Sequence, residues 1–168
     1  MASPPNPSFW SHSLDIHNKE WLQKEGFGGV IGVSQGSAKE PYLLVGEYNK
    51  SAKFKVSIIG KGVLFDTGGY SMKSPSGMET MKTDMAGAAT AWAIIKLAAS
   101  FKLNIGVKVL TPLVENMVSS TAIRPGDVLT MRNKKTIEVL NTDAEGRLIM
   151  ADALAYAAEE NPNLLCDV

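Results

Sequence analysis

The chain has 168 residues, which suffices for one domain with a hydrophobic core but not for the two domains of a typical mid-sized metallohydrolase. Apolar residues make up 45%, and 17 Lys+Arg balance 17 Asp+Glu, so the basic excess of a nucleic-acid-binding protein is absent. The single cysteine, Cys166, and the lack of an export signal or a bilayer-spanning apolar run predict a cytoplasmic protein with no membrane partner.

The first part of the chain carries few structural signals. Residues 1–28 are rich in Pro, Ser and Asn, and we expect a linker or the remnant of a preceding region there, with a short helix at Lys19–Lys24. Next, Val30–Val33 and Tyr42–Val45 predict two short strands on either side of a polar loop. Lys53–Ile59 then predicts a buried strand that ends at Gly60.

A strand, a long loop and a helix form the middle of the chain. The Gly-rich polar stretch runs from Lys61 to about Lys82, and a helix is predicted from Met85 to about Phe101. The apolar run Ile105–Leu110 predicts the next strand. A strand–helix–strand unit favours a parallel pair, so we expect this strand to lie parallel to the one that ends at Gly60.

The last third predicts a hairpin, a helix and a final strand. Val128–Met131 and Thr136–Val139 form the hairpin, a helix runs from about Arg147 to Glu159, and an apolar strand begins at Leu164. Helices that alternate with strands predict an α/β fold, here a mixed, largely parallel sheet flanked by helices. Because the chain stops inside a strand, we expect residues 29–168 to be a partial domain, truncated at its C-terminal end.

Four carboxylates lie in two loops that follow predicted strands, where function gathers in α/β folds. Asp66 and Asp84 belong to the long loop after Gly60, and Asp143 and Glu145 belong to the loop that precedes the last helix. These groups can converge only if something offsets their mutual repulsion. Divalent cations do that, and oxygen ligands suit Mn²⁺, Mg²⁺ or Zn²⁺. Both histidines, His12 and His17, lie in the N-terminal segment, which argues against a His-based zinc site.

Each of these features also has a purely structural interpretation. An Asp before a helix, such as Asp84, is usually an N-cap, whereas Asp66–Gly69 alone is typical of a turn and Asn141–Asp143 of an Asx-capped loop. Lys61 and Lys73 are of a type that is normally solvated. Arg147 in the first turn of a helix has no favourable dipole interaction, which indicates an anionic partner.

Two long motifs in these loops go beyond composition. Asn141–Leu148, with the sequence Asn-Thr-Asp-Ala-Glu-Gly-Arg-Leu, resembles the signature octapeptide of the leucyl aminopeptidase (cytosol aminopeptidase) family of dinuclear metallo-exopeptidases. The other site segment of that family resembles Gly60–Gly62, Phe65–Gly69, Lys73 and Met81–Asp84. The resemblance extends from about Gly29 to Val168 and includes two independent motifs in the right order, so it implies that residues 29–168 are a partial aminopeptidase catalytic domain.

The resemblance implies a ligand set for two divalent ions, Mn²⁺ or Zn²⁺ with Mg²⁺ as a further choice. A tightly held ion would take Lys61, Asp66, Asp84 and Glu145, and a more exchangeable ion would take Asp66, Glu145 and both the carboxylate and the carbonyl of Asp143. Asp66 and Glu145 would thus bridge. Lys61 can ligate only as a neutral amine, so its pKa would have to fall beside the dication.

The resemblance also implies an activity and further roles. The expected reaction releases N-terminal residues, Leu-like ones preferred, from peptides with a free N-terminus through a two-metal-activated water. Lys73 would stabilise the oxyanion and contact substrate, Arg147 would hold a bicarbonate that acts as general base, and Met81 and Asn141 would also contact substrate. The full-length protein would be a homo-oligomer, a hexamer by family resemblance.

Two other hypotheses stay open on sequence alone. A truncated or non-catalytic paralogue could act as a binding or assembly module, although the presence of all five presumed ligands with Lys73 and Arg147 favours intact chemistry. A dinuclear phosphoesterase would account for clustered carboxylates but not for the two long motifs.

Overall fold

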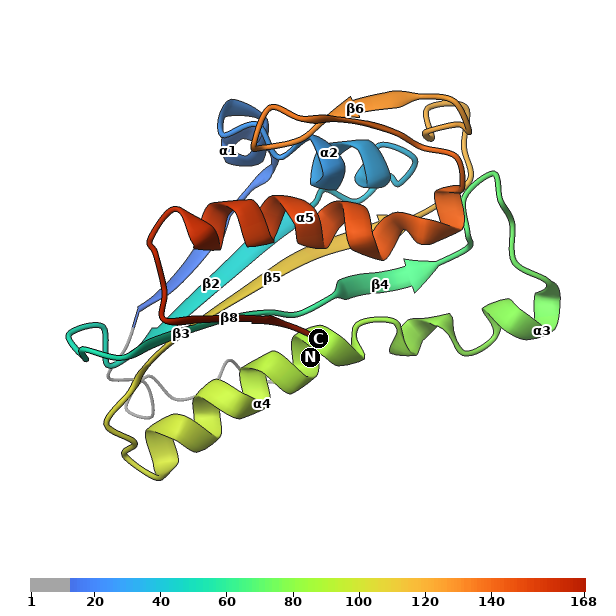
Figure 1. Ribbon diagram of the computed structural model, residues 1–168. Coiled ribbons are helices and arrows are strands. Elements are labelled where there is room, and N and C mark those ends of the chain that lie inside the picture. The colour runs from blue at the N-terminus through green and yellow to red at the C-terminus, as the bar shows by residue number, and fades with distance from the viewer. Residues whose placement is uncertain (1–12) are drawn as a thin grey trace.

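A mixed six-stranded sheet with helices on both faces forms the core of the computed structural model, which describes residues 13–168 (Figure 1). The sheet strands are β1 (Leu14–His17), β2 (Tyr42–Tyr48), β3 (Lys55–Ile59), β4 (Gly62–Asp66), β5 (Gly106–Asn116) and β8 (Leu164–Asp167). A separate hairpin pairs β6 (Val128–Thr130) with β7 (Thr136–Glu138). The helices are α1 (Lys19–Lys24), α2 (Gly28–Ser34), α3 (Pro75–Met78), α4 (Ala86–Ser100) and α5 (Glu145–Ala158), with short 3-10 turns η2 (Met81–Thr83) and η3 (Thr142–Ala144).

The eleven-residue strand β5 organises the sheet. The strand order is β1-β2-β5-β3-β8, and β4 also pairs with β5. β2 runs antiparallel to β5, whereas β3 and then β4 pair with successive parts of β5 in parallel. β8 is parallel to β3, and β1 is antiparallel to β2. The predicted α/β class and the mixed, largely parallel sheet are confirmed, as is the parallel pairing of β3 with β5.

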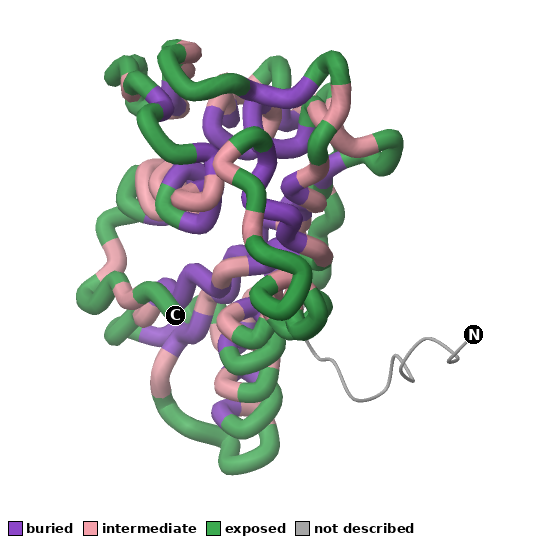
Figure 2. Tube along the Cα trace, turned by 90° about the vertical axis from the view of Figure 1, so that its right-hand side faces the viewer, coloured by how far each residue is buried: buried purple, intermediate pink, exposed green. Residues whose placement is uncertain are grey.

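Two hydrophobic clusters hold the layers together. On one face α2 and α5 pack on the sheet, and on the other face α4 does so (Figure 1). Ile149 and Val30 are fully buried in the first cluster, and Ala91 and Ile95 anchor the second. Buried stretches run through the interior, whereas exposed stretches form the outer turns (Figure 2). No helix within residues 13–168 is both long and apolar enough to cross a membrane.

The predicted strand at Val30–Val33 is wrong, because this segment belongs to α2. A four-residue apolar run fits a buried helix as well as a strand. Tertiary contacts decide between them here: the backbone N–H groups of Gly29 and Val30 donate to Oδ2 of Asp152, at 2.7 and 3.1 Å. Asp152 lies on α5, more than 120 residues away in sequence, so local sequence could not reveal this helix cap.

Two strands, β1 and β4, were missed, and two, β2 and β5, were predicted too short, since β2 continues to Tyr48 rather than ending at Val45. β4 lies within the stretch expected to be a polar loop, and β5 continues six residues beyond Leu110. Within residues 1–28, expected to be a linker or remnant, β1 pairs with β2 and α1 confirms the short helix; residues 1–12, with His12, lie outside the described residues. His17, at the end of β1, stacks on Trp21 at 3.7 Å between ring centroids.

Replacing Asp152 by alanine should destabilise the fold strongly. Its fully buried carboxylate accepts three backbone N–H groups, those of Gly29 and Val30 and, at 2.8 Å, that of Arg132. Each buried donor left without a partner costs about 1–3 kcal/mol, so the loss of the acceptor for three donors should lower the free energy of unfolding by at least about 3 kcal/mol, measured by urea denaturation. Asp15→Ala on the exposed face of β1 is the matched control, and a loss below about 1 kcal/mol for Asp152→Ala would contradict this capping role.

Candidate metal centre

The two predicted site loops meet at the carboxyl ends of parallel strands. Asp66 is the last residue of β4, and Lys61 occupies the two-residue break between β3 and β4. The octapeptide loop forms η3 and the first turn of α5, which lies at the same end of the sheet as the end of β4 (Figure 1). This placement follows the rule that sites in α/β sheets form where parallel strands end.

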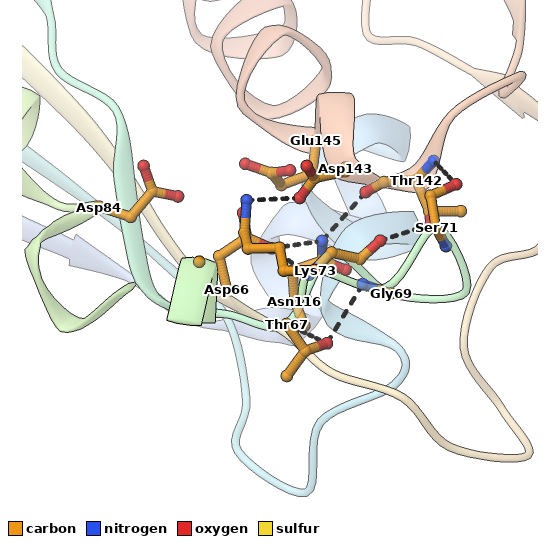
Figure 3. A network of polar contacts seen from close by, with 12 residues as sticks. Asp66, Thr67, Gly69, Ser71, Lys73, Asp84, Asn116, Thr142, Asp143 and Glu145 are labelled. Carbon is orange, nitrogen blue, oxygen red and sulfur yellow. Dashed lines mark hydrogen bonds and ion pairs between the residues drawn. The ribbon is translucent and has the colours of Figure 1, made fainter. Parts of the chain in front are cut away.

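Three of the four predicted carboxylates converge directly. Oxygen atoms of Asp66, Asp143 and Glu145 lie within 4.8 Å of one another. Asp66 and Glu145 are each only 1% exposed. Asp84 lies apart from these three carboxylates (Figure 3). The ammonium group of Lys61 connects Asp84 to Glu145.

Two lysine side chains run between the carboxylates. Lys61 Nζ lies 2.9 Å from both Asp84 Oδ1 and Glu145 Oε1. Lys73 Nζ lies 3.0 Å from Asp66 Oδ2 and 2.6 Å from Asp143 Oδ1 (Figure 3). Neither lysine is solvated in the ordinary way, because their side chains are only 27% and 17% exposed.

The carboxylates and the lysines shift one another's proton affinity. Burial lowers the pKa of Lys61, but hydrogen bonds to Asp84 and Glu145 outweigh that effect and raise the pKa above its usual value. The pKa of Lys73 is raised in the same way, by Asp143 and Asp66 against the effect of burial. Burial raises the pKa of Glu145, and repulsion from Asp66 adds to this. A metal ion could therefore bind the Lys61 amine only if it replaced the ammonium group as the partner of Asp84 and Glu145 and if the ammonium proton were released.

The donor set fits divalent cations. Four carboxylates face two ammonium groups, so negative charge is in excess. Oδ2 of Asp84 and Oε2 of Glu145 are buried and have no hydrogen-bond partner among the described residues. A buried carboxylate oxygen without a donor is costly unless a cation or a water satisfies it. Hard oxygen ligands of this kind suit Mn²⁺, Mg²⁺ or Zn²⁺.

Hydrogen bonds through Thr142 join the octapeptide loop to the loop that follows Asp66; these two segments are called the ligand loops below, after the role proposed for them. The Thr142 hydroxyl donates to the Gly68 carbonyl at 2.6 Å and accepts the Ser71 N–H at 2.8 Å, while the Thr142 N–H donates to Oγ of Ser71 at 3.2 Å. Gly69 adopts φ +62°, and a Cβ there would lie 2.8 Å from Thr142 Oγ1. A residue with a side chain at this position would be strained and would separate the loops.

Asn116, which sequence reasoning missed, lies inside this junction. It ends β5 opposite Asp66, is 1% exposed, and its Nδ2 donates to Asp66 Oδ1 at 2.8 Å and to the Thr142 carbonyl at 3.0 Å. The predicted strand stopped at Leu110, so this polar residue was not placed at a strand end. The continuing apolar run Leu113–Val114 followed by Glu115–Asn116 was the signal that could have found it.

The remaining predicted site residues lie around the cluster. Arg147 is exposed in the first turn of α5, and no ion pair links it to another described residue. Met81 begins η2 and is half-buried. Asn141 is exposed and caps η3, because its side-chain oxygen accepts the Asp143 N–H at 2.8 Å. Asp84 does not cap α4: that helix begins at Ala86, without a side-chain cap.

Gly146→Ala should weaken metal binding without lowering the stability of the fold. A Cβ at Gly146 would lie 2.8 Å from Cδ and Cε of Lys61 and 3.0 Å from its Nζ, so Lys61 would have to move away from Glu145. Alanine is otherwise the better helix residue, by about 0.5–1 kcal/mol. We expect unchanged or raised thermal stability with Mn²⁺ affinity about 10-fold weaker by isothermal titration calorimetry. Unchanged affinity would show that the displaced Lys61 is not a ligand.

Comparisons with known proteins identify the relatives of this chain. Residues 7–168 match the family model described as "Cytosol aminopeptidase family, catalytic domain". The "Probable cytosol aminopeptidase" of Micrococcus luteus is 48% identical over 157 residues, which cover 93% of this chain and 31% of that protein. The "Cytosol aminopeptidase" of Encephalitozoon cuniculi is 45% identical over 158 residues, which cover 93% of this chain and 32% of that protein.

Solved structures give the same result. The crystal structure of cytosol aminopeptidase from Coxiella burnetii is similar with a TM-score of 0.90 and 39% identity, over 95% of this chain and 35% of that one. The leucine aminopeptidase structure from Caenorhabditis elegans has a TM-score of 0.89 and 35% identity, over 93% of this chain and 32% of that one. The chain thus spans about a third of the length of the curated relatives that it matches.

Proposed function

Because this chain belongs to the cytosol aminopeptidase family, we propose that it carries the metal site of an aminopeptidase that removes N-terminal residues, Leu-like ones preferred, from peptides. The observation that carries the proposal is the convergence of Asp66, Asp143 and Glu145 within 4.8 Å, inside the two motifs typical of that family. The buried, donor-free oxygens of Asp84 and Glu145 support it.

The proposed ligands divide into two sets that share Asp66 and Glu145. One ion would take the shared carboxylates with Lys61 and Asp84, and the other would take them with the Asp143 carboxylate and carbonyl. Support comes from Lys61 Nζ, which already joins Asp84 to Glu145, and from the short distances within the other group. Mn²⁺ or Zn²⁺ are the proposed ions, and Mg²⁺ is a third choice.

When bound, such ions would activate a water and hold the free α-amine and the first carbonyl of a peptide. The chain's own cation beside them is Lys73. Its Nζ lies against Asp66 and Asp143, which raise its pKa, and the proposal places the developing negative charge of a substrate oxygen beside this ammonium group. A positioned cation of this kind stabilises an oxyanion.

Three further residues have proposed roles. Arg147 would hold bicarbonate as general base; an exposed guanidinium that no described carboxylate pairs with, at a helix start, supports an anionic partner there. Met81 and Asn141 would contact substrate. The Asn141 side chain uses its oxygen for the η3 cap, so its amide N–H groups are what it can offer to a peptide carbonyl.

Location and assembly are also proposals. We propose a cytoplasmic protein that acts on peptides with a free N-terminus and, in its full-length form, a homo-oligomer of hexameric type. The word "cytosol" in the names of the relatives supports the location.

The test is Mn²⁺-dependent release of the anilide from leucyl anilide, with N-acetyl-leucyl anilide as the matched control. The blocked substrate has no amine lone pair to coordinate, so we expect release from the free amine alone. Equal release from both substrates would contradict the exopeptidase assignment. A folded chain that binds Mn²⁺ but releases neither would favour a non-catalytic binding or assembly role.

A further inference from the structure

Asn116 connects the two ligand loops through a single nitrogen atom. Its Nδ2 donates one hydrogen to Oδ1 of Asp66 at 2.8 Å and the other to the carbonyl of Thr142 at 3.0 Å. Asp66 ends β4 and Thr142 directly precedes Asp143, so each acceptor belongs to a different ligand loop (Figure 3). Both N–H groups of the amide are directed at protein atoms, and the side chain is buried.

The contact with Asp66 fixes which carboxylate oxygen faces the cluster. Oδ1 of Asp66 accepts from Asn116 Nδ2 and also from the Gly68 N–H, each at 2.8 Å. Oδ2 is the oxygen on the side of Lys73, whose Nζ is 3.0 Å away. Two donors on one oxygen hold the carboxylate plane, because rotation about the Cβ–Cγ bond would break both hydrogen bonds.

Asn116 is itself held firmly. It stands opposite Asp66 in the β4–β5 register, and its carbonyl accepts the Thr67 N–H at 3.0 Å and the Thr67 hydroxyl at 2.9 Å. β4 pairs with β5 at Asn116 itself, and β2 and β3 flank β5 on its two sides earlier in the strand, over Val107–Leu110. The sheet therefore fixes the position of Asn116, and the two hydrogen bonds of its amide fix Asp66 and Thr142 relative to the sheet.

We propose that Asn116 is a positioning residue for the dinuclear centre, which sets the placement of Asp66 relative to the Asp143 loop and thereby the separation of the two ions. The inference rests on the proposed function. The role requires an amide, since an ionised carboxylate donates no hydrogen, a hydroxyl donates one and an aliphatic side chain donates none. Hydrogen bonds that orient ligands in this way typically change metal affinity by about 10–100-fold when removed.

The test compares Asn116→Leu, which keeps the approximate size without donors, with Asn116→Ser, which keeps one donor. Thr111→Val is the matched control, because Thr111 is a fully buried polar residue of the same strand that accepts the Trp92 Nε1–H at 3.0 Å. Each chain is titrated with Mn²⁺ by calorimetry and examined by electron paramagnetic resonance, at a temperature where unfolding curves show it to be folded.

We expect two exchange-coupled ions in the unaltered chain and in Thr111→Val. Asn116→Leu should bind Mn²⁺ about 10–100-fold more weakly and lose the coupled signal, with Asn116→Ser intermediate. If Asn116→Leu does not fold, the comparison of Asn116→Ser with Thr111→Val decides. Unchanged affinity and coupling in the folded Asn116 variants would overturn this inference alone, whereas failure of the unaltered chain to bind Mn²⁺ would overturn the proposed function as well.

Discussion

Glu145→Ala should remove both metal ions from the chain. The carboxylate is proposed to ligate both, is 1% exposed, and carries one oxygen at 2.9 Å from Lys61 and another without a described partner. Its loss removes a shared ligand, so we expect affinity for each Mn²⁺ to fall by at least about 100-fold, beyond the effect of removing a group that only orients a ligand. Calorimetric titration measures both sites.

Two companion variants separate this effect from a packing defect. Glu145→Gln keeps the side-chain volume but removes the charge, and it should lose most of the affinity as well. Glu138→Ala, at an exposed position of β7, should bind two ions like the unaltered chain. Full occupancy of both sites in Glu145→Ala would show that Glu145 does not bridge.

Lys73→Ala should reduce kcat by about 10²–10³-fold, the cost of removing a group that stabilises an oxyanion, and leave both ions bound. The reason is that Lys73 Nζ lies beside the proposed ligands Asp66 and Asp143, and we propose that it acts there as an ammonium group, which has no lone pair with which to bind a metal. Hydrolysis of leucyl anilide gives kcat, and calorimetry gives the number of ions. Loss of metal from Lys73→Ala would contradict the assigned role.

The same substitution should also change stability in a metal-dependent way. In metal-free buffer the buried Asp66 loses its ammonium partner, so the free energy of unfolding should fall by about 3 kcal/mol, and saturating Mn²⁺ should restore most of it. Lys82→Ala, at an exposed position of η2, is the control and should show neither effect.

The parts of the fold that sequence could predict are those with strong local signals. The Ala-rich run before Phe101 predicted α4, and the apolar stretches ending at Ile59 and Leu110 predicted parallel strands. α2 could not be predicted, because its N-terminal N–H groups depend on Asp152 from a distant helix. β4 was missed because glycines on both sides made Val63–Phe65 look like part of a loop.

The candidate site also contains residues that the sequence could predict and residues that it could not. Asp66, Asp143 and Glu145 were predicted to converge from their loops and motifs, and the structure brings them together. Sequence could not show that Asp84 reaches the cluster through Lys61 rather than directly, since that depends on where η2 sits beside β4. The role of Asn116 was also hidden, because it depends on a register between two strands that only the folded sheet defines.

The central claim is that Lys61 and four carboxylates hold two ions. Anomalous diffraction from crystals soaked in Mn²⁺ tests it most directly. We predict two strong peaks, one between Lys61, Asp84 and the shared pair Asp66 and Glu145, and the other between that pair and Asp143. An absence of peaks there, with Lys61 still paired to both Asp84 and Glu145, would contradict the claim.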